Sequence, residues 1–320
     1  MGLLRRGLPF SISPPARGGW LSTGAYDRGG MAESRDRWAE WLAERRFGGD
    51  PGERQRVLAD LGGIRGKVLD RAHLTGGEHL LDVGCGEGLL AFGALDRGAG
   101  RVTFSDISAD LLDYCRHAAA EQGVQERCEF VQAPADDLSL IGDGTVDVVT
   151  TRSVLIYVKH KDRAFSEFAR VLRPGGRISL FEPINRFSRT HHAASFVGYD
   201  LTGLEEIRDK LRAVFDRLQP PDTDPMTDFD ERDLVRLAGD AGFSPIHLTL
   251  EVVVEPLPPR DWDGFLSTAG NPNIPTIDEA MRAALTTAEQ DRLTSHLRPL
   301  VEQGSGIWRM ATAFLAATKN

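Results

Sequence analysis

A short apolar run that ends in a glycine-rich turn is the feature that most constrains the fold of this chain. The run, HLLDVGCGEGLL, leads from a strand-like segment into a helical one through Gly84, Gly86 and Gly88. Glycine accepts backbone angles that other residues avoid, and it leaves no Cβ between the main chain and a ligand. The turn therefore predicts a βαβ fold that binds a ligand where strand and helix meet.

Short apolar runs alternate with helical patterns along the rest of the central chain. The expected strands are, in order, 79–83, 101–106, 128–132, 146–150 and 177–182. This alternation is typical of an α/β protein with a Rossmann-like, doubly wound and mostly parallel sheet. Two later β-like runs, at 247–255 and 310–318, predict an antiparallel pair at one edge.

The segments around this core predict helices. Two N-terminal helices are expected at 33–74, with Trp38, Trp41 and Leu42 on one face of the first. Ligands in open α/β sheets bind at the carboxyl ends of the strands, so helical insertions there are expected to cover the active site. The other divisions are a disordered extension at 1–32, a ligand-binding core at 75–184, a helical insertion at 185–228, the end of the core with an edge strand at 229–255, a second insertion at 256–308 and a last strand at 309–320.

Composition limits the partners of this protein. A net charge of −9 over 320 residues offers no global basic field for nucleic acid or an anionic membrane surface. No apolar run approaches the roughly 18–20 residues of a membrane span. Three cysteines match neither a disulfide framework nor a paired-cysteine zinc site, which favours a reducing compartment, the cytoplasm, and predicts no metal. The first thirty residues lack the apolar stretch of a signal peptide, so a disordered extension is favoured over a targeting segment.

Four motifs, taken in order, resemble those of the class I S-adenosylmethionine (SAM)-dependent methyltransferases. The G-C-G-E-G turn follows an acidic residue in its strand, and VTFSDIS ends the second strand with Asp106. FVQAPADDLSL stands at the end of the third strand, and FARVLRPGGRISLFEP leads into the fifth. In these motifs the chain is most similar to the broad group of ubiquinone/menaquinone-type and arsenite-type methyltransferases.

The resemblance implies SAM as the cofactor. The glycine turn would lie against its methionine part, with Asp82 orienting the loop or the amino group. Asp106 would accept the ribose hydroxyls. Arg152 would pair with the methionine carboxylate, although a salt bridge to a neighbouring acid is an equal alternative. The residues that the resemblance places around the cofactor are Asp82, Gly84, Cys85, Gly86, Gly88, Asp106, Ile107, Ala135, Asp136 and Arg152.

The expected function is methyl transfer to a small molecule, through an oxygen, nitrogen or carbon nucleophile. The candidates for a general base or substrate contact are Glu182, Tyr157 and His191, because the topology places them on the ligand side. A capping role for Glu182, a core position for Tyr157 and an exposed loop position for His191 remain open. The second insertion is expected to serve either as a pocket wall or as the surface of a homodimer.

Three other functions compete with this interpretation. An NAD-dependent oxidoreductase is disfavoured because the glycine spacing differs from the dinucleotide turn. A SAM-binding protein with a regulatory or cyclising role would keep the same turn, because fold does not fix function. Methylation of a nucleic-acid base or a protein amide would favour an Asn-Pro-Pro-Tyr-type motif after the fourth strand, where this chain reads TTRSVLIY.

Overall fold

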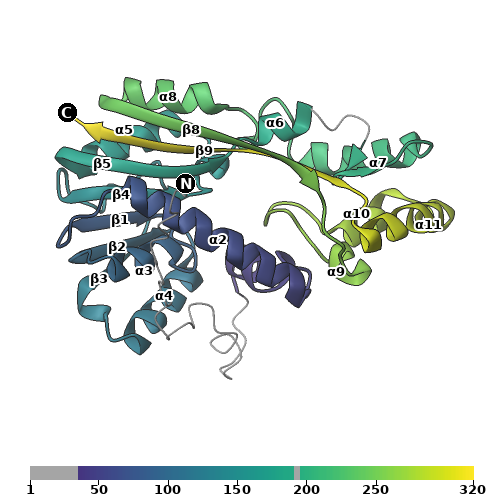
Figure 1. Ribbon diagram of the computed structural model, residues 1–320, viewed down its shortest axis with the longest axis horizontal. Coiled ribbons are helices and arrows are strands. Elements are labelled where there is room, and N and C mark those ends of the chain that lie inside the picture. Colours follow the sequence, from purple (N-terminus) through teal and green to yellow (C-terminus); the bar gives the residue numbers. More distant parts are fainter. Residues whose placement is uncertain (1–34, 191–194) are drawn as a thin grey trace, which may run out of the picture. The chain divides into compact units, whose positions relative to one another are not determined.

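A seven-stranded sheet forms the centre of the protein in the computed structural model, which describes residues 35–190 and 195–320 (Figure 1). The predictions for residues 1–32 and for His191 lie outside the described residues. The strand order is β3-β2-β1-β4-β5-β9-β8. The strands are β1 (His79–Val83), β2 (Arg101–Asp106), β3 (Cys128–Gln132), β4 (Val146–Arg152), β5 (Leu172–Pro183), β8 (Phe243–Pro256) and β9 (Ile307–Lys319).

The strand order confirms the doubly wound sheet that the sequence predicts. Strands β1 to β5 are parallel, and β9 pairs antiparallel with both β5 and β8. The single strand that runs against the others is therefore β9, and it lies between β5 and the edge strand β8. The chain moves outward from β1 to β3 and then crosses back to β4, so the order reverses between β1 and β4. Ligands of doubly wound sheets bind at such a reversal, outside the carboxyl ends of the strands.

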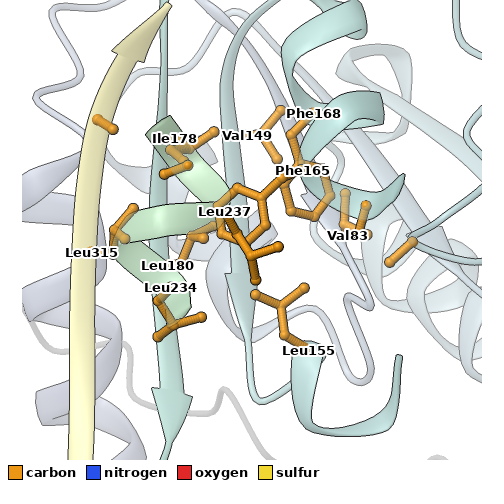
Figure 2. Packing of buried hydrophobic residues seen from close by; sticks show 14 of the residues in the cluster. Val83, Val149, Leu155, Phe165, Phe168, Ile178, Leu180, Leu234, Leu237 and Leu315 are labelled. Atoms are coloured by element: carbon orange, nitrogen blue, oxygen red, sulfur yellow. The ribbon is translucent and has the colours of Figure 1, made fainter. Parts of the chain in front are cut away.

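Helices cover both faces of the sheet because successive strand residues point to opposite sides. In β1, Leu80 packs with α2 (Pro51–Arg71), α3 (Leu89–Asp96) and α4 (Ala109–Glu121). Its neighbour Leu81 joins the cluster on the other face. Figure 2 shows that cluster, where side chains of α5 (Lys161–Val171) and α8 (Glu231–Asp240) meet those of β4, β5 and β9. Within the described residues, no helix is long and apolar enough to cross a membrane.

Two elements differ from the sequence prediction. The helix predicted to begin near residue 33 is a short α1 (Arg37–Glu40) that continues as a π-helical turn, η1 (Trp41–Arg45). Strand β5 begins at Leu172 and contains the Arg-Pro-Gly-Gly segment that was expected to precede it. Its pairing with β4 jumps from Leu172 to Arg177, so the intervening residues bulge out of the ladder, with Gly175 at φ +75°.

The two insertions pack together into one helical unit, which we call the helical lobe (residues 195–218 and 262–303). Ile207 and Leu211 from the first insertion share a buried cluster with Trp262, Phe265 and Met281 from the second. The sequence predicted two separate insertions and gave no sign that they share a core. The two insertions contain α6 (Asn185–Thr190), β6 (Ser195–Phe196), β7 (Tyr199–Asp200), α7 (Glu205–Leu218), α9 (Trp262–Leu266), α10 (Ile277–Ala284) and α11 (Thr287–Gln303).

A long β-ribbon positions the helical lobe. The pairing between β5 and β9 ends at Pro183 and Thr312, whereas β8 and β9 remain paired to Pro256 and Ile307. The ribbon therefore extends beyond the carboxyl end of β5, and α9, α10 and α11 follow at its tip (Figure 1). The lobe consequently lies on the side of the sheet where a ligand is expected.

Lys161 joins α5 to the segment before α8. Its Nζ donates to the carbonyl oxygens of Val158 and Pro225, each at 3.0 Å, and pairs with Asp228 at 2.6 Å. The ammonium also lies 4.7 Å from the centre of the Phe229 ring. All donors of this buried cation are therefore placed against acceptors.

We expect Lys161→Met to lower the free energy of unfolding by about 2 kcal/mol, because it leaves a partly buried carboxylate and two carbonyl oxygens without their hydrogen-bond donor. Lys159→Met, on the exposed residue two positions earlier, is the matched control. Urea unfolding of both variants checks this. Equal midpoints for the two variants would contradict a stabilising role for Lys161.

Candidate functional site

The glycine turn between β1 and α3 is tight on its inner side and open at its centre. Gly84, Gly86 and Gly88 have φ angles of +64°, +53° and +80°. A Cβ on Gly84 would lie 2.4 Å from a methyl carbon of Val154, and one on Gly88 would lie 2.6 Å from the ring of Phe92. A Cβ on Gly86 would meet no atom within 4 Å. The turn is thus fixed against β4 and α3 while its central residue can be approached by a ligand.

Asp82 at the end of β1 holds this turn from below. Its Oδ1 accepts a hydrogen bond of 3.0 Å from the Thr150 hydroxyl, and its Oδ2 accepts one of 3.0 Å from the Ala91 amide. Burial raises the pKa of Asp82 to about 7. Of the two roles that the sequence left open for this residue, these contacts support orientation of the loop.

Asp106 at the end of β2 holds the turn from the side. Its Oδ2 accepts from the Gly86 amide at 2.8 Å, and its Oδ1 accepts from the Ser108 amide at 2.9 Å. Each carboxylate oxygen has a further lone pair, so both can also accept from ligand hydroxyls. The neighbouring Ile107 is 45% exposed and offers an apolar surface beside the carboxylate.

The remaining cofactor candidates differ in what they expose. The side chains of Cys85 and Ala135 are buried in the two clusters that flank the sheet, so only their main-chain atoms are available to a ligand. Asp136 is partly exposed. Burial also raises the pKa of the Cys85 thiol, and the thiol of Cys115 lies close to it.

Glu182 at the end of β5 organises the loop after β4. Its Oε1 accepts hydrogen bonds of 3.0 Å from the amides of both Val154 and Leu155, and its Oε2 accepts one of 3.3 Å from Ile156. The side chain is fully buried, which raises its pKa to about 7. These contacts fix the 3-10 turn η3 (Leu155–Tyr157) and support the structural role that the sequence left open.

Tyr157, the last residue of η3, faces the N-terminal residues. The ring of Trp38 packs edge-on against it, with ring centres 4.8 Å apart. Burial raises the pKa of Tyr157 to about 12, so the phenol is protonated at neutral pH. The third catalytic candidate, His191, belongs to the part of the chain that the structure leaves undescribed.

Residues 36–50, here called the N-terminal strap, connect the glycine-turn side of the site to the helical lobe. At one end the Asp36 amide donates to Asp110 at 2.6 Å, and the Ser108 hydroxyl donates to Asp36 at 2.5 Å. Farther along, the Trp41 indole donates to the Ala269 carbonyl at 2.8 Å. The strap thus passes from the end of β2 to the lobe, and Trp38 meets Tyr157 on the way.

Three charged side chains lie close together where the strap approaches the glycine turn. They are Arg46 of the strap, Glu87 and Arg152, and we call them the charged cluster. The pKa of Arg46 is lowered to about 10, mainly by burial and also by Arg152, whereas Glu87 opposes the shift. Burial also lowers the pKa of Arg152 and raises that of Glu87. Of these three residues, the sequence motifs indicated only Arg152 as a cofactor contact. Glu87 was visible within the G-C-G-E-G turn, whereas nothing in the sequence placed Arg46 beside it.

Comparison with known proteins identifies the core of this chain. A family model described as "Methyltransferase domain" matches residues 81–180. The chain contains a class I methyltransferase domain. It is 36% identical over 142 residues to "Ubiquinone/menaquinone biosynthesis C-methyltransferase UbiE" of Pseudomonas putida (strain GB-1), an alignment that covers 42% of this chain and 55% of that protein. The chain therefore spans about half the length of the curated relatives it matches.

Solved structures that are similar to this chain include a geranyl diphosphate methyltransferase in complex with SAM. It is 20% identical, the match covers 85% of this chain and 92% of that one, and the TM-score is 0.49. The [4+2]-cyclase SpnF is also 20% identical, with 80% of each chain covered and a TM-score of 0.47.

The methyltransferase domain confirms the predicted family, and SAM is the cofactor of that family. The residues at the turn fit such a cofactor: an approachable Gly86 lies beside a carboxylate with free lone pairs and an exposed apolar side chain. The matched residues include Asp82 to Arg152 but exclude Glu182, the strap and the lobe. Of the catalytic candidates in the described residues, Tyr157 therefore lies inside the matched domain and Glu182 lies outside it.

We expect Glu182→Gln to flatten the pH dependence of stability. A carboxyl whose folded-state pKa is raised binds more protons in the native state, so its stability contribution is lost as pH rises from the unfolded to the folded pKa. For Glu182 that window runs from 4.5 to about 7. The wild type should thus lose up to about 3 kcal/mol relative to the variant across it.

Urea unfolding between pH 4.5 and 8 measures this difference. Glu121→Gln, on an exposed helical residue, is the control and should keep the wild-type profile. Parallel profiles for the wild type and Glu182→Gln would show that burial of this carboxyl does not alter its ionisation.

Proposed function

We propose that this protein is a SAM-dependent methyltransferase that acts on a small-molecule acceptor. SAM supplies an activated methyl group on a sulfonium, so the protein has mainly to bind, orient and desolvate the two reactants. The observation that carries the proposal is the glycine turn of the methyltransferase domain, held open at Gly86 by the Asp106 carboxylate.

The proposed cofactor contacts follow from what each side chain exposes. Asp106 would accept the ribose hydroxyls through its remaining lone pairs, and Ile107 would pack beside the base. Cys85 and Ala135 would contribute main-chain groups only, and Asp136 its partly exposed carboxylate. Arg152, at the carboxyl end of β4, would pair with the methionine carboxylate.

A small acceptor is favoured by what surrounds the carboxyl ends of the strands. The strap is tied to the lobe by the Trp41 indole and by the ion pair between Arg45 and Glu279 at 2.6 Å. A net charge of −9 gives no general attraction for a polyanion. Together these features favour an acceptor enclosed between the sheet, the strap and the lobe, over one presented on a large polymer.

Among the catalytic candidates, we propose that Tyr157 contacts the acceptor and that Glu182 is a positioning residue. A phenol with a pKa of about 12 holds its proton at neutral pH and therefore donates a hydrogen bond, so Tyr157 is proposed as a donor to the acceptor. Glu182 acts through η3, which carries that tyrosine. The accepting atom, whether oxygen, nitrogen or carbon, depends on the acceptor.

Asp106→Ala should weaken binding of S-adenosylhomocysteine by roughly 10- to 100-fold, because it removes charge-assisted hydrogen bonds to the ribose. Isothermal titration with the wild type and the variant measures this loss. Asp113→Ala, which removes an exposed carboxylate that pairs with Arg116 on α4, is the matched control and should bind normally.

Asp106 also orders the glycine turn, so a second ligand separates the two effects. The 2′-deoxy analogue of S-adenosylhomocysteine lacks one of the proposed hydroxyl contacts. If Asp106 binds the ribose, the variant should lose less affinity for this analogue than for the parent compound. Equal losses for both ligands would assign Asp106 to loop order alone and would remove the basis for its ribose role.

A further inference from the structure

Within the described part of the protein, the side chains of the charged cluster form no hydrogen bond and no ion pair. Several other arginines of the fold are paired; for example, Arg177 meets Glu78 at 3.0 Å and Arg170 meets Glu167 at 2.7 Å. Arg46, Glu87 and Arg152 lie close enough to alter one another's ionisation, yet none of them is joined to another. All three side chains are partly exposed, so their charged atoms are open to a ligand, and this arrangement points to a charged ligand.

The three members of the cluster come from two different parts of the protein. Glu87 lies within the glycine turn, and Arg152 ends β4 two residues before Val154, which packs against Gly84. Both therefore belong to the cofactor side. Arg46 follows the π-helical turn of the strap, where the Arg46 amide donates to the Trp41 carbonyl at 2.9 Å. Its neighbour Arg45 accepts from the Ala269 amide at 2.9 Å, so Arg46 is fixed from the lobe side.

Neighbouring rings hold the Arg46 guanidinium in place. Its central carbon lies 5.4 Å from the centre of the Trp41 ring and 5.3 Å from that of Phe47. Cation–π contacts of this kind position a guanidinium while its N–H groups stay available to a planar anion. Of the two rings, Phe47 is buried, whereas Trp41 is partly exposed and provides apolar surface beside the charge.

The charges of SAM suggest different partners for Arg152 and Arg46. The amino-acid end of SAM carries one carboxylate and one ammonium, which Arg152 and Glu87 can neutralise from the cofactor side. Arg46 then remains without a counter-charge, and the sulfonium adds another positive charge nearby. An acceptor with a negative charge would offset this excess of positive charge.

We propose that the methyl acceptor carries an anionic group, a carboxylate or a phosphate, and that Arg46 binds it. This inference rests on the proposed function and names the class of its substrate. The acceptor would place its anionic oxygens on the Arg46 guanidinium and its apolar part against the partly exposed ring of Trp41.

Paired probes test the proposal on the full chain saturated with S-adenosylhomocysteine. Isothermal titration at constant ionic strength compares 4-hydroxybenzoate with 4-hydroxybenzamide, and phenyl phosphate with phenol. In the wild type, the charged member of at least one pair should bind about tenfold more tightly or better. Arg46→Gln should abolish that preference and leave the affinity for S-adenosylhomocysteine within about threefold.

Two further variants complete the test. Arg37→Gln, on an exposed arginine of the same strap, should keep the wild-type preference. Arg46→Lys keeps the charge but loses the bidentate donor, so it should retain a reduced preference even if Arg46→Gln folds poorly.

The outcomes distinguish this inference from the proposed function. No preference for either charged probe in the wild type would overturn it, as would loss of S-adenosylhomocysteine binding in Arg46→Gln with the probe preference unchanged. The second result would assign Arg46 to the cofactor carboxylate. Failure of the wild type to bind S-adenosylhomocysteine at all would instead overturn the proposed function.

Discussion

The site depends on carboxylates at the ends of strands that accept backbone N–H groups from the neighbouring loops. Asp82 lies near the end of β1 and accepts a hydrogen bond from the Ala91 amide at the start of α3. Asp106 is the last residue of β2 and accepts hydrogen bonds from the Gly86 and Ser108 amides. Glu182 does the same from β5 for three successive amides of the loop after β4. Loops that would otherwise be mobile are thereby fixed at the carboxyl edge of a rigid sheet.

This arrangement has a measurable electrostatic cost. Burial raises the pKa of both Asp82 and Glu182 to about 7, although the amide donors oppose the shift. Each carboxylate is less stable in its ionised form than it would be in water, and folding elsewhere must compensate. The compensation comes from the two clusters that cover the faces of the sheet and bury residues such as Leu80 and Leu81 completely. The same rigid core permits the charged cluster to remain without internal partners.

The strap and the lobe, which we propose enclose the acceptor, are held by contacts between segments far apart in the chain. The strap reaches Ala269 through Trp41, and the lobe draws its core from both insertions. Because β8 and β9 extend beyond β5, this lobe stands at the carboxyl edge, where the strap can reach it. The family match ends at residue 180, before all of these elements except the strap, which precedes it. Apart from Tyr157, the groups proposed to surround the acceptor therefore lie outside the residues that the family model matches.

The amino-acid sequence alone predicts the five parallel strands, the glycine turn and the acids at the strand ends, because apolar periodicity and glycine geometry act over a few neighbouring residues. It also indicated the antiparallel pair that closes the sheet. Three features follow only from the packing of distant segments. Glu182 is buried among the amides of η3, the two insertions form one lobe, and Arg46 lies close to Glu87 and Arg152. These outcomes depend on how distant segments pack against one another, and no local pattern encodes the direction in which a partly buried side chain such as Arg46 points.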